Sequence, residues 1–172
     1  RSTVFSYLET DIQVALSYVF PRAVVAKIGG EIPADERTDL YKHLNQEQRD
    51  ALLPALAQAQ REDIRKLSAY EERTAGALMT SDYATLAAHM TVSEALAALR
   101  LEAPDAEPIY HAYVIDDERK LLGVVSLRVL ILAAPEQLIN DIMMSTVVSC
   151  NVNDDQEDVA KVVARYDLIA LP

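Results

Sequence analysis

The sequence predicts an α+β protein in which a superhelix of helical hairpins precedes a β-α-β-β-α unit and part of a second such unit. Three observations predict this fold. Residues 1–73 show helical periodicity with short connections, residues 78–132 alternate β-rich runs with helices, and that second pattern starts again 64 positions later. With 172 residues, 51% of them hydrophobic, the chain can form one or two cores.

The first third of the chain is predicted to be helical throughout. Apolar residues recur at three- and four-residue steps and would form one stripe on a first helix, namely Val4, Phe5, Leu8, Ile12, Ala15, Leu16 and Val19. Pro21 stands where the next helix begins, and Gly29-Gly30 is expected to end it. A third helix follows Pro33, and Asn45 caps a fourth. Such short, closely joined helices are typical of stacked helical hairpins.

A joint at residues 71–76 separates these helices from the β-rich region. A short strand is predicted over Ala84–Leu86, and Thr91 with Glu94 forms a capping box before the next helix. A polar loop with two prolines is expected over residues 101–108.

Two β-rich runs follow and complete the first unit. The run 109–115 is apolar on both faces, which favours a buried central strand. A charged hairpin at 116–120 connects it to the run 121–125, and the apolar stretch 127–132 closes the unit.

The second copy is recognised from its spacing. Ile142-Met143 stands 64 positions after Leu78-Met79, and an apolar helical stripe recurs at the same offset. A strand, a helix capped by Asp154 or Asp155, and the start of another strand are predicted at 147–149, 155–165 and 168–171. Because this copy lacks its later elements, we expect the native protein to continue or another chain to supply them.

Composition restricts the function classes. The net charge of −11 argues against a nucleic-acid surface, and the charge is concentrated after residue 73, at −9 against −2 before it. This density is consistent with a solvated surface, or with carboxylates that bind a divalent cation. The single Cys150 and the lack of a membrane-spanning apolar stretch predict a soluble, cytoplasmic chain. No catalytic motif is recognised, so we predict no enzyme.

The most specific stretch of the sequence is the joint Thr74-Ala75-Gly76-Ala77-Leu78-Met79-Thr80, and it is accompanied by the stretches 32–40, 90–96, 109–116, 122–128 and 154–160. Together these stretches resemble the cytosolic part of the MgtE family of magnesium channels. The resemblance covers nearly the whole chain. It implies a truncated helical N domain at 1–73, a first CBS (cystathionine-β-synthase) domain at 74–135 and half of a second at 136–172.

The resemblance also implies a function. Family members place this region before a transmembrane pore, on the cytoplasmic side of the membrane, and close the pore when magnesium bridges the N and CBS domains. It further implies a homodimer through CBS helices at 92–99, 127–132 and 159–163, whose apolar positions exceed what one sheet face can bury.

Six residues are candidate magnesium ligands. Asp35 and Asp39 are four residues apart, so both carboxylates project from one helix face. By resemblance these two acids, the carbonyl of Gly76 and the acids of Asp155, Glu157 and Asp167 bind Mg²⁺. The alternatives are stabilisation of the helix dipole, capping and solubility.

Nucleotide binding is the main alternative function, because CBS pairs often bind adenine nucleotides. Tyr110 and Arg128 match the contacting positions of the family. However, Val129 replaces the usual ribose-binding aspartate, and Leu168 replaces a stacking aromatic residue. Weak or no binding of ATP or AMP is therefore expected. A third possibility is a scaffold that only holds partners.

Overall fold

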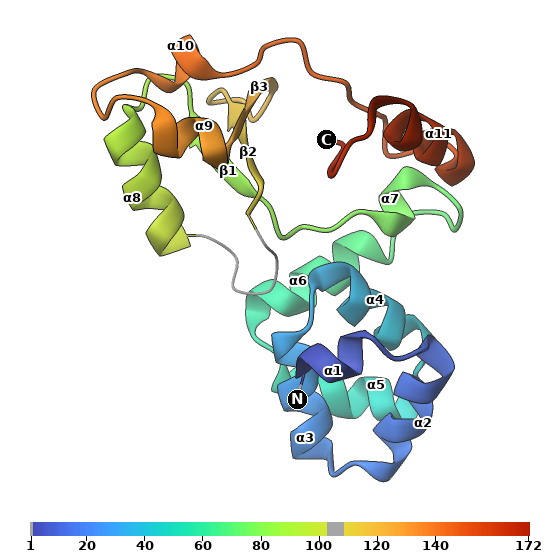
Figure 1. The fold of residues 1–172 in the computed structure, drawn as a ribbon. Helices are drawn as coiled ribbons and strands as arrows, with labels where there is room; N and C mark the ends of the chain where they lie inside the picture. Colours follow the sequence, from blue (N-terminus) through green and yellow to red (C-terminus); the bar gives the residue numbers. More distant parts are fainter. Residues whose placement is uncertain (1, 103–108) are drawn as a thin grey trace. The chain divides into compact units, whose positions relative to one another are not determined.

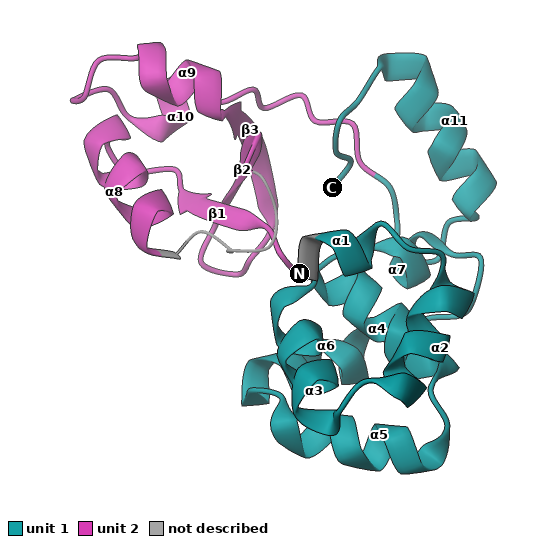
Figure 2. Ribbon diagram, turned by 60° about the horizontal axis from the view of Figure 1, so that its bottom comes forward, with its two compact units in different colours: residues 1–81, 150–172 teal, residues 82–149 magenta. Residues whose placement is uncertain are grey.

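The computed structural model describes residues 2–102 and 109–172, which form two compact units (Figure 1). One unit combines residues 1–81 with residues 150–172, and the remaining residues form the other (Figure 2). The predicted α+β architecture is confirmed, since helices occupy the first part of the chain and a mixed sheet follows. None of the described helices is both long and apolar enough to cross a membrane.

The helices of the first 73 residues pack around a shared apolar core that includes Ile32, Leu40, Leu52 and Ile64. They are α1 (Ser2–Ser6), α2 (Thr10–Val19), α3 (Arg22–Glu31), α4 (Ala34–His43), α5 (Gln46–Leu52), the 3-10 turn η1 (Leu53–Ala55) and α6 (Gln58–Leu67).

The predicted helix starts in this region are confirmed, whereas one predicted end is wrong. Pro21 and Pro33 occupy the N-cap positions of α3 and α4, and the Asn45 side chain accepts the Gln48 N–H at the start of α5. However, α3 continues through Gly29-Gly30 to Glu31. Gly29 serves packing, because a Cβ there would lie 3.2 Å from a methyl group of Leu52.

The single first helix predicted from the apolar stripe is also wrong. The chain breaks between α1 and α2, and α2 buries Gln13 and Ser17 while Ile12 and Val19 are exposed. The buried amide has a specific role, since Gln13 Nε2 donates to the carbonyl of Phe5 at 3.0 Å. A side chain thus satisfies a carbonyl at the end of α1, which explains why a polar residue faces the core.

The second unit contains a mixed three-stranded sheet. Its strands are β1 (Ala84–Ala87), β2 (His111–Ile115) and β3 (Leu121–Ser126), and β2 is central as predicted. β1 and β2 are parallel, whereas β2 and β3 form the predicted hairpin. The loop predicted at 101–108 is wrong at its first two residues, because residues 101 and 102 are still helical. Residues 103–108 of this predicted loop lie outside the described residues.

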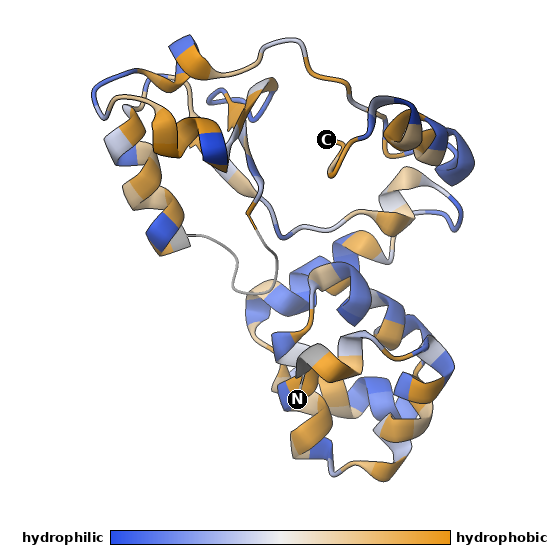
Figure 3. Ribbon diagram, in the orientation of Figure 1, coloured by the Kyte–Doolittle hydropathy of each residue, from blue (hydrophilic) through white to orange (hydrophobic). Residues whose placement is uncertain are grey.

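One face of the sheet packs against helices. Ala112, Val114 and Val125 form a core with residues of α8 (Val92–Glu102) and α9 (Leu127–Leu132). Figure 3 shows α9 as a mainly hydrophobic helix, and Ile131 and Leu132 on it are 65% and 73% exposed.

The repeat predicted from the sequence is present in the structure. The short helices α7 (Ala75–Leu78) and α10 (Ile139–Ile142) are 64 positions apart, as are the long helices α8 and α11 (Gln156–Tyr166). The predicted strands at 147–149 and 168–171 are not formed, and only the Cys150 N–H bonds the Pro172 carbonyl, at 3.0 Å. An isolated hydrogen bond without flanking pairs does not constitute a ladder.

The two copies exchange their short helices. In the first unit, the Ala75 N–H donates to the carbonyl of Asp154 at 2.8 Å, next to the start of α11. In the second unit, the equivalent Ile139 N–H donates to the carbonyl of Met90 at 2.9 Å, next to the start of α8. Each short helix therefore lies against the long helix of the other copy.

Candidate functional site

The first candidate site is on α4, whose position is fixed by a buried arginine. Arg37 is 4% exposed, and its guanidinium donates to the carbonyls of Gly29 at 2.7 Å and Ile32 at 2.8 Å. Asp35 is half-buried in the first turn, and Asp39 lies one turn later and is exposed. Lys42 Nζ is 3.8 Å from the Asp39 carboxylate.

A third carboxylate beside Asp35 was not identified from the sequence. Burial raises the pKa of Glu36, a Ser6 hydrogen bond opposes this shift, and the charge of Asp35 adds to it. Among the described residues, Oε2 of Glu36 is buried without a hydrogen-bond donor. A sequence signal existed, since Glu36 adjoins Asp35 in the same first turn. Its partial burial and its hydrogen bond to Ser6 of α1 could be seen only in the tertiary structure.

The second candidate site is the joint between α7 and α11. The Gly76 N–H donates to the carbonyl of Val152 at 2.8 Å, and Thr74 forms an antiparallel bridge with Asp155. Gly76 is buried under Tyr70, because a Cβ there would lie 2.6 Å from Cγ of the ring. The glycine is therefore required by packing, whatever its carbonyl binds.

The acids at the start of α11 are exposed, and each has a local partner. Asp155 accepts the Glu157 N–H at 2.8 Å as the N-cap, and Asp154 accepts the Asn151 N–H at 2.8 Å. Glu157 Oε1 is 3.2 Å from Arg73 Nη2, and Asp158 is 2.7 Å from Lys161 Nζ.

Asp167 ends the same helix. It is the C-cap of α11 with φ of 50°, a left-handed conformation that Asp tolerates better than most residues. Its carboxylate is ten residues from Glu157, so the structure places it at the opposite end of α11 from the acidic first turn. All six candidate magnesium ligands lie in the first unit, but in three separate places.

The donor chemistry suits magnesium, although the side chains form no cage. Within residues 2–102 and 109–172, no group of three His, Cys, Asp or Glu side chains could hold a metal. Mg²⁺, however, keeps several waters and often binds protein through one or two carboxylates. Asp35 with Asp39, and Asp155 with Glu157, are pairs of this kind.

The two candidate nucleotide contacts lie together in the second unit. The Leu127 N–H donates to the carbonyl of Tyr110 at 2.9 Å, which places Tyr110 beside the start of α9. Arg128 is the next residue, and both side chains are exposed. The Ser126 side chain caps α9 by accepting the Val129 N–H at 3.2 Å.

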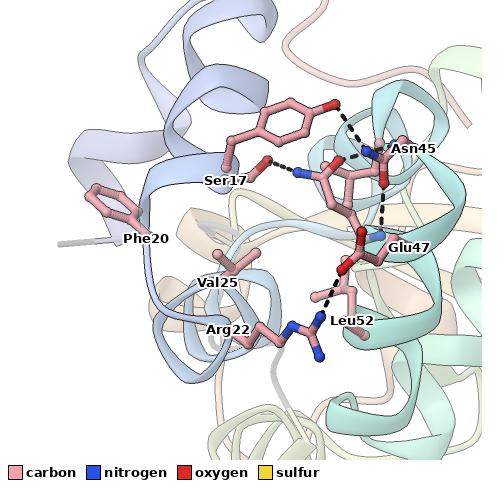
Figure 4. A pocket seen from close by; sticks show the side chains of 11 residues that line it. Ser17, Phe20, Arg22, Val25, Asn45, Glu47 and Leu52 are labelled. Atoms are coloured by element: carbon pink, nitrogen blue, oxygen red, sulfur yellow. Dashed lines mark hydrogen bonds and ion pairs between the residues drawn. The ribbon is translucent and has the colours of Figure 1, made fainter.

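A small cavity of about 200 Å³ lies between α2, α3 and α5 (Figure 4). Phe20, Val25 and Leu52 form apolar parts of its wall. Its polar groups bind one another: Arg22 pairs with Glu47 at 3.0 Å, and Gln48 donates to Ser17 at 3.0 Å. Polar groups that are already satisfied by one another point to no particular ligand.

Comparison with protein families divides the chain at the joint. Residues 1–73 match the MgtE intracellular N domain, and residues 75–136 match the CBS domain. The magnesium transporter MgtE of Enterococcus faecalis is 46% identical over 110 residues, which are 64% of this chain and 24% of that protein. The MgtE of Bacillus subtilis is 32% identical and aligns with all of this chain. The chain covers 41% of that relative's length.

Solved structures agree with the sequence matches. The crystal structure of the soluble part of a magnesium transporter is 36% identical, with a TM-score of 0.91, and the match covers 99% of this chain and 68% of that one. The cytosolic domain of the Mg²⁺ channel MgtE in complex with ATP gives the same identity and TM-score, with 99% and 70% coverage. The resemblance seen in the sequence is confirmed: the chain belongs to the MgtE family of magnesium transporters, in which it represents the helical N domain and the CBS region.

Proposed function

We propose that the chain is a magnesium-sensing part of the cytosolic region of a magnesium channel. The observation that carries this proposal is the 36% identity and TM-score of 0.91, over 99% of the chain, with the soluble part of a magnesium transporter. The acid pair on α4, in which Asp39 is exposed and Asp35 half-buried, and the exposed pair at the start of α11 support it, because their oxygen donors suit Mg²⁺. Within this proposal residues 1–73, 74–135 and 136–172 are the N domain and two CBS copies.

The proposed mechanism is a shift between two arrangements of the cytosolic region. The chain carries a net charge of −11, so acidic faces repel each other when no cation is bound. Magnesium held by Asp35 and Asp39, by the Gly76 carbonyl, or by Asp155, Glu157 and Asp167 would relieve this repulsion. It favours a compact arrangement that closes the pore only if it binds that arrangement more tightly.

The proposed assembly is a homodimer through the CBS helices, attached to a transmembrane pore on the cytoplasmic side. The exposed Ile131 and Leu132 on α9 support this contact, because such apolar residues favour burial against a partner. The role is regulatory, without an enzymatic step.

Nucleotide sensing is a second candidate function. It is favoured by the ATP complex of a relative with a TM-score of 0.91 and by the proximity of Tyr110 to α9. Against it, Val129 offers no acceptor for a ribose hydroxyl, and Leu168 offers no aromatic face. We propose that the nucleotide affinity of this chain is weak.

A ligand-dependent melting experiment tests these proposals together. MgCl₂ from zero to tens of millimolar, at constant ionic strength, should raise the melting temperature and reduce the radius of gyration in small-angle scattering. A ligand of the native state adds about 2.7 kcal/mol of stability at one hundred times its dissociation constant. ATP or AMP without the metal should have little effect.

Paired variants identify the origin of the effect. Asp155→Asn with Glu157→Gln should reduce the magnesium response, whereas Asp117→Asn with Glu118→Gln should retain it. The control pair removes the same charge from exposed acids of the β2–β3 hairpin. Flat melting and scattering curves in magnesium would contradict the sensor proposal, and micromolar ATP binding would favour nucleotide sensing.

A further inference from the structure

An arginine forms an ion pair with Glu157, one of the candidate magnesium ligands. Arg73 Nη2 lies 3.2 Å from Glu157 Oε1, although the two residues are 84 positions apart. The backbone fixes this proximity, because the carbonyl of Arg73 accepts the Gln156 N–H at 2.9 Å. Arg73 itself has φ of 68°, an uncommon conformation for a residue with a Cβ. The joint thus places a cation beside the acidic first turn of α11.

The charges around this contact are unbalanced. The first turn of α11 and its N-cap region contain Asp154, Asp155, Glu157 and Asp158, whereas the basic side chains paired with them are Arg73 and Lys161. Hydrogen bonding to Asp158 raises the pKa of Lys161, and the charges of Asp158, Glu157 and Asp155 contribute to the shift. Two acids therefore remain uncompensated by an ion pair in the described contacts.

We propose that Arg73 is a built-in competitor of magnesium at Glu157 and thereby sets the magnesium concentration to which the first unit responds. This inference rests on the proposed sensor function. A cation that binds Oε1 of Glu157 competes with the guanidinium for the lone pairs of that oxygen, and at either carboxylate oxygen it is repelled by the positive charge of Arg73.

The size of the expected shift in magnesium response follows from the exposure of the Arg73–Glu157 ion pair. Both side chains are about two-thirds exposed, at 68% and 66%, so the ion pair is weak and readily opened. An exposed pair of this kind should raise the half-saturating magnesium concentration by about 1.5- to fivefold. The arginine would thus shift the response to higher magnesium without preventing it.

A magnesium titration of the whole chain tests the proposal with three variants. Arg73→Gln keeps a Cβ at the left-handed position but removes the cation, so its midpoint should fall by about 1.5- to fivefold. Arg73→Lys keeps the charge and should stay near the wild type. Arg165→Gln removes the same charge from the last turn of α11, about 12 Å from Glu157 along the helix axis. At this distance salt screens the charge, so the midpoint should not move.

The readouts are the backbone amide signals of Glu157 and Asp158 and the Arg73 Nε–H signal in NMR spectra, with KCl compensating for MgCl₂. In the wild type, the Arg73 signal should change at the same magnesium concentration as the Glu157 amide. A wild type that responds with the same midpoint as Arg73→Gln would overturn the competition and leave the sensor function standing. No response in either protein would overturn both.

Discussion

The contact of α7 with the start of α11 and the equivalent contact of α10 with the start of α8 share their backbone hydrogen bonds. Around these two joints, by contrast, the side chains are unlike in burial and charge. In the first unit, Gln156 N–H donates to the Arg73 carbonyl, and in the second Val92 N–H donates to the Gln137 carbonyl, both at 2.9 Å. Every residue of these two bonds is displaced by 64 positions in the other copy. Equivalent hydrogen bonds thus hold both short helices.

The side chains around the two joints differ in burial and charge. At α8, Val92 and Ala95 are 1% and 0% exposed, and Ile139 of α10 is 0% exposed. At α11 the described side chains include none that is fully buried, and acids occupy the first turn. The second-unit joint is therefore part of a hydrophobic core, whereas at the first-unit joint the first turn of α11 is charged and exposed to solvent.

The largest expected difference between the copies is in core stability. Leu99→Ala should lower the free energy of unfolding of the second unit by about 3 kcal/mol, because Leu99 is buried in its core. The equivalent Val163→Ala on α11 should cost about 1 kcal/mol or less, since Val163 is only half-buried. Amide hydrogen exchange in β2 and in α11 measures the two units separately. Equal losses would show that the copies are equally packed.

Gly76 should give an intermediate effect that sharpens the comparison. Gly76→Ala forces a Cβ into the Tyr70 ring and should cost about 1–3 kcal/mol. Chemical denaturation of the variant measures this loss. Gly30→Ala is the matched control, because its Cβ would meet only the Gln60 side chain, at 3.7 Å, and alanine favours the helix. If Tyr70→Ala does not rescue the Gly76 variant, the ring is not the cause.

The smallest expected effect is a loss of stability at acid pH through Glu94 at the start of α8. The Thr91 N–H and then the Thr91 hydroxyl lower the pKa of Glu94 by bonding its carboxylate. A carboxyl group whose folded pKa is depressed stabilises the fold above its unfolded pKa, about 4.3, and this contribution is lost as the pH falls through the folded pKa.

Glu94→Gln retains a capping side chain without this titration. The urea midpoint of the second unit should therefore fall less for Glu94→Gln than for the wild type when the pH is lowered from about 6 to about 3. Glu118→Gln, in the exposed hairpin, is the control and should behave like the wild type. At the position equivalent to Glu94, Asp158 pairs with Lys161 instead. Identical acid sensitivity of Glu94→Gln and wild type would contradict the role of this cap.

Much of the fold was predictable because the signals are local. The helix starts at Pro21, Pro33, Asn45 and Asp155 were expected from side chains that satisfy or replace a free N–H, which acts within a few residues. The central position of β2 followed from its apolar faces. The orientation of α2 was not predictable, because Gln13 is buried through one hydrogen bond to Phe5. For the candidate site, the acids could be found from the sequence, but the burial of Glu36 and the partner of Glu157 could not.

By itself, the sequence determined that a helical region precedes two copies of one unit, because periodicity, caps and the 64-residue spacing are written along the chain. It also placed a cluster of acids at the start of α11. Only the tertiary structure decided that the copies exchange α7 and α10 and that Arg73 meets Glu157. The physical reason is that these hydrogen bonds and this ion pair join residues far apart in sequence, and no local pattern specifies which distant backbone will satisfy them.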